Sequence, residues 1–159
     1  MRPLRRLAAS LAAGAIAIVL NTLALNAADL VALPTARGGL LRLSWPWIAP
    51  LLQAVGLGTP LPSNPSVQVG FHLVVGLLMA VFYAFLMEPW LPGAPFWQGV
   101  FYAVAVWLLN AAVVLPLTGE GFAGSAHLTV AGVLWFAAAH TLFFVLMAVI
   151  YARLRGGRG

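Results

Sequence analysis

Four long apolar runs without a charged residue constrain this chain more than any other feature of its sequence. They cover residues 7–28, 67–87, 95–115 and 128–151. Each run is about 20 residues long, which as a helix spans the roughly 30 Å hydrocarbon core of a bilayer. Only 7% of the residues are charged, against roughly 25% in soluble domains. We therefore expect an all-α, polytopic membrane protein with four transmembrane helices, built as a single membrane domain over residues 1–159.

The arginines predict which way the four spans cross the membrane. All eight basic residues are arginines, and six of them lie near the two ends of the chain: Arg2, Arg5, Arg6, Arg153, Arg155 and Arg158. Four spans place both termini on one side, which the positive-inside rule identifies as the cytoplasm. The net charge of +5 is then explained by topology and indicates no nucleic-acid partner. We expect a multi-pass protein of the bacterial inner (plasma) membrane, surrounded by the lipid bilayer.

The first apolar run has a rival interpretation as a secretory signal peptide, because such peptides open with a basic segment and an apolar stretch. A membrane helix is favoured here. The run is longer than the apolar core of a signal peptide, and residues 25–27, Leu-Asn-Ala, are a poor small-x-small cleavage site.

A long connection follows the first span. Six prolines exclude a continuous helix from it: Pro34, Pro46, Pro50, Pro60, Pro62 and Pro65. Within it, residues 44–55 are expected to form a short helix with Ser44 as N-cap and Pro46 in the first turn. Trp45 and Trp47 indicate that this is an interfacial helix, lying in the headgroup layer. Such a helix either anchors the chain at the interface or covers a ligand site.

A motif near the middle of the chain recurs near its end. His72–Tyr83 reads HLVVGLLMAVFY, and His140–Tyr151 reads HTLFFVLMAVIY. The histidine, the sequence Leu-Met-Ala-Val and the tyrosine stand at the same offsets in both. Because this spacing is almost three helical turns, the histidine and the tyrosine of each copy lie on one helix face.

A weaker match extends this motif into a repeat of whole hairpins. Leu-Asn-Ala-Ala occurs at residues 25–28 and again at 109–112. The chain therefore reads as two tandem hairpin repeats, repeat one at about residues 7–88 and repeat two at about 95–154. Each copy has an even number of spans, so we expect a pseudo-twofold axis along the membrane normal to relate them.

Small residues at four-residue spacing mark the expected helix-packing faces, because they let helix backbones approach closely in a bilayer. The predicted packing residues are Ala9, Ala13 and Ala17 in the first span, Gly76 and Ala80 in the second, and Ala148 in the fourth. The second copy has Phe144 where the first has a glycine. Close helix approach is therefore not expected at Phe144.

The motifs resemble those of a group of small bacterial four-helix inner-membrane proteins that share a domain of unknown function. In that family a helix begins with His, continues with small residues and ends with Tyr; a span ending in Asn, Pro and a Gly-x-Gly loop precedes the last helix. The matching residues here are His72, Gly76, Ala80, Tyr83, Asn110, Pro116, Gly119, Gly121, His140, Ala148 and Tyr151. The resemblance covers the second to fourth spans. It implies a four-helix membrane domain and carries over no activity.

Two histidines and two asparagines are the main candidates for chemistry within the spans. His140 lies about 14 residues before the cytoplasmic end of its helix, and His72 has a similar offset. Both therefore lie roughly 20 Å from that boundary. Asn110 falls near the same level, and Asn26 somewhat higher. Polar side chains at membrane depth must find partners, so all four are candidate ligand-binding residues.

Two interpretations of the histidines stay open. In the first, each bonds to an asparagine or a backbone carbonyl of a neighbouring helix, contributing on the order of 1 kcal/mol to packing. In the second, His72 and His140 face each other and bind a ligand, ligate a metal such as the iron of haem b, or relay protons. Nearby small residues could make room for a porphyrin. Two histidines alone do not complete a zinc site.

The remaining polar residues receive simpler predictions. Tyr83 and Tyr151 lie near the cytoplasmic boundary, where an aromatic belt is the expected role, and they are also kept as candidate ligand-binding residues. Glu88 and Glu120 lie in turns on opposite sides of the membrane and are expected to be solvated. His127 is expected to face solvent.

The residues do not indicate an enzyme. The chain has no cysteine. Nothing in the sequence resembles a nucleophile beside a base, and nothing resembles a phosphate-binding glycine loop. The leading hypothesis is a structural or accessory subunit that associates with itself or with a larger membrane complex. The alternative is a ligand-binding or redox subunit that uses His72 and His140. A small transporter or proton path is the third.

Overall fold

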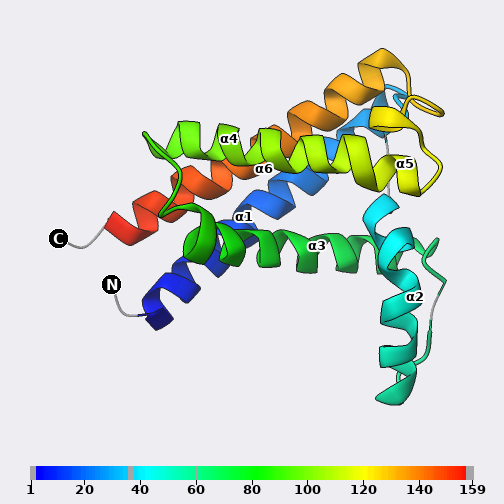
Figure 1. The fold of residues 1–159 in the computed structure, drawn as a ribbon, viewed down its shortest axis with the longest axis horizontal. Helices are drawn as coiled ribbons and strands as arrows, with labels where there is room; N and C mark the ends of the chain where they lie inside the picture. The colour runs from blue at the N-terminus through cyan, green and yellow to red at the C-terminus, as the bar shows by residue number, and fades with distance from the viewer. Residues whose placement is uncertain (1–2, 36–37, 60, 157–159) are drawn as a thin grey trace.

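The structure is a computed structural model that describes residues 3–35, 38–59 and 61–156 (Figure 1). Arg2, Arg158 and Pro60 lie outside this part of the chain. Four helices are long and apolar enough to cross a membrane: α1 (Pro3–Leu30), α3 (Pro65–Phe82) continued by η1 (Tyr83–Met87), α4 (Pro95–Leu109) continued by η2 (Asn110–Val114) and α5 (Leu115–Leu117), and α6 (Val130–Gly156). Two shorter helices, α2 (Gly39–Ala54) and η3 (Phe122–Gly124), lie in the connections. The described residues contain no strand, and the predicted all-α class with four membrane-length helices is confirmed.

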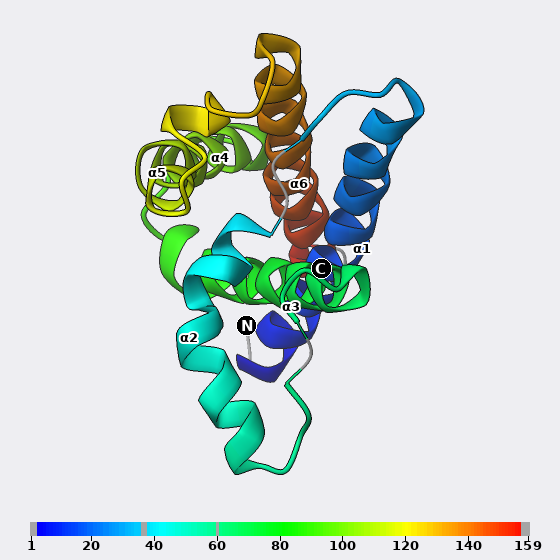
Figure 2. The ribbon, with the colours of Figure 1, turned by 90° about the vertical axis from the view of Figure 1, so that its right-hand side faces the viewer.

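The long helices pack in a fixed order. α1 and α6 lie against each other at the centre, α3 packs on α1, and α4 packs on α6. The contacts therefore run in the order α3, α1, α6, α4. Both termini lie at one end of the bundle, called here the terminal end (Figure 1). α2 and the connection before α6 lie at the opposite end, called the loop end, which faces the viewer in Figure 2.

The two outer helices, α3 and α4, contact each other around one tyrosine. The Tyr102 ring stacks on Phe82 and Tyr83, with centroids 6.3 and 5.9 Å apart. Its hydroxyl group donates to Met79 Sδ over 3.1 Å. Among the described residues, α3 and α4 share no extended interface like that between α1 and α6. The predicted pseudo-twofold axis would make those two pairs equivalent, so the packing is less symmetric than the repeat implies.

Small residues allow α1 and α3 to approach closely. A Cβ atom built on Gly76 would lie 2.5 Å from Ile18 Cγ1, and one on Gly14 would lie 2.6 Å from the Ala80 Cβ. Such distances are too short for real side chains. Ala13 and Ala17 are fully buried in the same core, and Ala9 packs against its edge. The alanine strip of the first span thus lies at a helix contact.

α4 and α6 also approach closely, contrary to the expectation from Phe144. A Cβ atom on Gly99 would lie 2.7 Å from Val145 Cα and 2.8 Å from the Phe144 carbonyl oxygen. The small residue at this crossing belongs to α4. The Phe144 ring is buried, with its centroid 4.6 Å from that of Tyr102. Ala148 lies in the same core.

Two prolines explain where the long helices widen into π-turns. The Glu88 N–H bonds to the Tyr83 carbonyl oxygen five residues earlier, and the Leu115 N–H bonds in the same way to Asn110. Pro89 and Pro116 follow directly. A proline ring would clash with the carbonyl four residues before it in a regular helix, and the wider turn removes that clash. The third span therefore continues through Pro116 to Leu117. The sequence had predicted that it ends at residue 115, before the proline.

The loop helix begins at residue 39, whereas the sequence had predicted a start at residue 44. α2 starts at Gly39 after the left-handed Gly38, and the Ser44 hydroxyl donates to the Leu40 carbonyl oxygen within the helix. Ser44 is therefore not the N-cap, and Pro46 lies in the helix interior. In Figure 1, α2 runs across the direction of α3. Trp47 and Leu51 within α2, and Val55 directly after it, are exposed.

Glu88 joins both ends of the chain at the terminal end. Its carboxylate accepts from Arg6 Nη2 over 2.8 Å and also from Arg155. The Glu88 side chain is only 13% exposed, so the prediction of a solvated carboxylate was wrong. The partners lie far away in the sequence, one in α1 and one in α6.

Replacing Gly99 by alanine should destabilise the bundle. The added methyl group meets backbone atoms of α6, which cannot rotate away, so α4 and α6 must separate. Overpacking of this kind costs about 1–3 kcal/mol. The measurement is the fraction folded in mild detergent as the mole fraction of SDS rises, followed by far-UV circular dichroism.

Gly70→Ala is the matched control, because a methyl group at this position in α3 meets no atom within 4 Å. It should keep or slightly raise the stability, since alanine favours a helix by up to about 1 kcal/mol over glycine. Equal stability of the two variants would contradict the close crossing of α4 and α6.

Candidate binding site

A cavity of about 410 Å³ lies in the loop-end half of the bundle. All four long helices and the first turn of α2 contribute to its walls, which are mainly apolar. The cavity brings together the four polar residues predicted for the site: His72, His140, Asn110 and Asn26. Its size falls within the roughly 300–1,000 Å³ range of small-molecule pockets. The residues therefore form one candidate binding site.

The first turn of α2 separates α3 from α5 beside the cavity. A Cβ atom on Gly38 would lie 3.3 Å from Gln68 Nε2 of α3, and one on Gly39 would lie 3.5 Å from Leu115 of α5. Leu41 is 1% exposed and lines the cavity. The start of α2 is thus a wedge between α3 and the end of the third span. The predicted helix over residues 44–55 does not line the cavity; only the residues just before it do.

Asn21 fixes the positions of three helices around the cavity. Its side chain is 1% exposed. The Asn21 Nδ2 donates to the Ala139 carbonyl oxygen of α6 over 2.7 Å, and its Oδ1 lies 2.8 Å from His72 Nε2 of α3. The sequence analysis missed Asn21. The sequence does indicate that Asn21 is buried, because Ala13, Ala17 and Asn21 follow one another at four-residue spacing on the same helix face.

These hydrogen bonds also determine which ring nitrogens carry protons. A backbone carbonyl can only accept, so the Asn21 amide nitrogen faces Ala139 and its oxygen faces His72. His72 must then donate from Nε2, which leaves Nδ1 of the neutral ring without a proton. His140 donates from Nδ1 to the Phe136 carbonyl oxygen over 2.8 Å. Nε2 of neutral His140 is therefore its unprotonated nitrogen.

Asn110 lies at the first position of the π-turn η2. π-Turns within helices frequently occur at functional sites. Asn26 lines the cavity from α1 and is exposed. Neither side chain hydrogen-bonds another described residue of the protein, so both amides are available to a ligand.

Tyr83 and Tyr151 are not part of this cavity. Both rings are 1% exposed and contact each other edge to face, with centroids 5.9 Å apart. The Tyr83 hydroxyl donates to Gln98 Oε1 over 2.8 Å, and the Tyr151 hydroxyl accepts from Arg6 Nε over 3.2 Å. The predicted aromatic belt is therefore wrong for these two residues. They belong to the core near the terminal end.

The histidine pair does not fit axial ligation of haem iron through both Nε2 atoms. His72 Nε2 is occupied by Asn21, and its withdrawal would leave a buried amide oxygen without a partner. The described residues also contain no cluster of three or more His, Asp or Glu side chains that could hold a metal ion.

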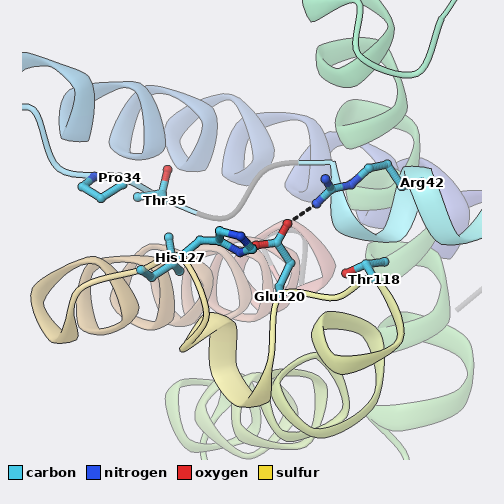
Figure 3. Close-up of a pocket in the computed structure, with 7 residues that line it drawn as sticks. Pro34, Thr35, Arg42, Thr118, Glu120 and His127 are labelled. Carbon is cyan, nitrogen blue, oxygen red and sulfur yellow. Dashed lines mark hydrogen bonds and ion pairs between the residues drawn. The ribbon is translucent and has the colours of Figure 1, made fainter.

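A second polar cluster anchors α2 at the loop end. Arg42 follows the buried Leu41 and pairs with Glu120, which also accepts from His127 Nδ1 over 2.9 Å. Figure 3 shows Arg42 and His127 reaching Glu120 from opposite sides. His127 is 66% exposed, whereas Glu120 is only 13% exposed. The prediction of a solvated Glu120 was therefore wrong.

Comparisons of the chain with protein families, curated proteins and solved structures found no match. The resemblance to the four-helix inner-membrane proteins thus rests on the motif residues alone. The site is interpreted below from its geometry.

Replacing Asn21 by leucine should destabilise the bundle. The change removes two hydrogen bonds and leaves His72 Nε2 without its acceptor. Hydrogen bonds between membrane helices contribute about 0.6 kcal/mol on average and up to about 1.7 kcal/mol, so a loss near the upper value is expected. The SDS titration described above measures it. Asn26→Leu is the control, and an equal loss in both variants would contradict the central role of Asn21.

Acidification should release α2 from the loop end. The hydrogen bond from Arg42 lowers the pKa of the Glu120 carboxyl group below its ordinary value, against the opposing effect of partial burial. The ion pair therefore stabilises the docked helix above the unfolded-state pKa of about 4.3. This stabilisation is lost as the pH falls through the lower pKa of the docked state.

Spin labels on Leu51→Cys in α2 and Val130→Cys in α6 would measure this release, because the natural chain has no cysteine. The distance distribution should be narrow at neutral pH and should broaden as the pH falls through the lowered pKa of Glu120. Glu120→Gln should broaden it at both pH values, whereas Glu88→Gln at the terminal end should not. A distribution that stays narrow in acid would refute the anchoring role of Glu120.

Proposed function

We propose that this protein binds a small, mainly apolar molecule that it takes up from the bilayer. The observation that carries this proposal is that His72, His140, Asn110 and Asn26 line one cavity whose walls are mainly apolar. Pockets of this composition bind a ligand by burying its apolar body and orienting it through a few polar groups. The hydrogen bond from His72 to Asn21 holds the His72 ring in place before a ligand binds.

The side between α3 and α4 is the proposed entrance. Val69 of α3, Leu109 of α4 and Leu40 of α2 all line the cavity and are exposed. In a bilayer these apolar residues would face lipid tails. A molecule dissolved in the membrane could therefore enter sideways, without passing through water.

The membrane orientation is part of the proposal. Six of the arginines lie near the chain ends, which favours an inner-membrane protein with both termini in the cytoplasm. The cavity lies in the opposite half of the bundle. The ligand would then bind in the outer half of the bilayer, beneath α2, and no reaction is required of the site.

A structural or accessory role in a larger complex is the second candidate. It is favoured by the open side of the bundle, where α3 and α4 share no extended interface among the described residues. A helix of another chain could pack there in place of a small molecule. The same experiment separates the two proposals, because one gives a small bound mass and the other a second polypeptide.

Filling the cavity should prevent ligand binding. Val75 lines the cavity, and Val75→Phe adds a ring to its wall. Protein purified from membranes in mild detergent would be compared by native mass spectrometry, with chemical identification of the released molecule. The wild type should carry a small neutral adduct. The variant should carry about a tenth as much or less, since losing 1.4 kcal/mol of binding free energy is a tenfold change in affinity.

Val74→Phe is the matched control, because Val74 is 54% exposed and does not line the cavity. It should retain the adduct. A wild-type protein without a bound small molecule, or equal occupancy in Val75→Phe, would contradict the proposed function.

A further inference from the structure

The free nitrogens of the two histidines define what kind of polar group the cavity can accept. His72 Nδ1 and His140 Nε2 are acceptors, because the opposite nitrogen of each ring donates within the protein. Among the described residues, the buried side-chain nitrogen or oxygen atoms without a partner comprise only Thr35 Oγ1. Neither free ring nitrogen is therefore sealed inside the protein. A ligand must bring donors to these positions.

The cavity also favours a neutral ligand. The side chains that line it include no Asp, Glu, Lys or Arg within the described part of the chain. A charged group placed there would have no opposite charge at membrane depth, where such burial is costly. The donor is thus a hydroxyl or an uncharged N–H group, and a carboxylate or ammonium group does not fit.

Several aromatic side chains line the same cavity as His140, and one of them contacts its ring. Phe136, Phe143 and Phe144 of the same helix line the cavity, and Trp107 lines it from α4. The Phe136 ring lies 4.2 Å from the His140 ring, measured between centroids. Aromatic walls favour planar rings, which can stack on their faces or meet them edge to face. A planar aromatic group therefore fits beside the free nitrogen of His140.

We propose that the ligand is a neutral aromatic alcohol, a molecule of the phenol class with an apolar tail, whose hydroxyl group donates to His140 Nε2. This inference rests on the proposed function and specifies the ligand of the same cavity. Asn110 can donate or accept, so it does not exclude other groups. His140 distinguishes a donor group on the ligand from an acceptor group. An ether or ketone oxygen would face the lone pair of His140 Nε2 and could not bond it.

Three probes with the same carbon skeleton test the proposal. Para-heptylphenol carries the donor, para-heptylanisole replaces it with an acceptor, and heptylbenzene has neither. Their binding to the full chain in lipid nanodiscs would be measured by equilibrium dialysis, with empty nanodiscs correcting for partition into lipid. The phenol should bind about tenfold more tightly than the anisole, as expected for one hydrogen bond in an apolar site. The anisole and heptylbenzene should bind alike.

Equal binding of the phenol and the anisole would overturn the phenol assignment while supporting a general apolar site. Binding of none of the three probes above the empty-nanodisc level would overturn both the assignment and the proposed function. These outcomes use the wild-type chain and do not depend on whether a variant folds.

Three variants then test the role of His140. His140→Leu should abolish the preference for the phenol and retain binding of heptylbenzene. His140→Gln keeps an acceptor oxygen and should retain part of the preference. Thr141→Val removes a hydroxyl group that bonds the Ala137 carbonyl oxygen within α6 and does not line the cavity, so it should leave the preference unchanged. A full preference for the phenol in His140→Leu would overturn the assignment of the hydroxyl group to this residue.

Discussion

The structure depends on one buried amide that is satisfied on both sides. Asn21 lies in α1, one of the two central helices, where an unpaired amide would be costly because neither water nor lipid tails can bond it in the interior. Bonding Ala139 fixes the register of α1 against α6, and bonding His72 fixes α3 against α1. α4 has no contact in this network and is held through α6. The side between α3 and α4 is therefore the one that can remain open.

Much of the fold could be predicted because the bilayer imposes a simple relation between sequence and position. A helix rises 1.5 Å per residue, so an uncharged run gives a span and a residue offset gives a depth. That relation placed His72, His140, Asn110 and Asn26 at levels close enough to share one cavity. The same relation gives no information on rotation about each helix axis. Rotation is why Tyr83 and Tyr151, predicted to belong to an aromatic belt at the membrane boundary, instead meet in the core.

The features that could not be predicted involve partners distant in the sequence. Glu88 and Glu120 are isolated carboxylates along the chain, yet each is paired with residues of other elements once the helices assemble. The crossing of α4 and α6 likewise needed one small residue, and Gly99 supplies it from the helix opposite Phe144. By contrast, the π-turns before Pro89 and Pro116 have a local cause. A proline six residues after the first residue of each turn is a signal that could be searched for in other sequences.

The cavity lies beside a feature in which the two predicted hairpin repeats differ, the length of the connection between their spans. If the two hairpins had connections of equal length, α3 could pack on α4 as α1 packs on α6. The bundle would then have no open side between α3 and α4. The first hairpin has the longer connection, and α2 within it extends between Gln68 of α3 and Leu115 of α5. The second hairpin supplies Glu120, which pairs with Arg42 directly after that wedge. The first hairpin thus provides the wedge, and the second provides its anchor. The buried Leu41 is the point at which the two contributions meet.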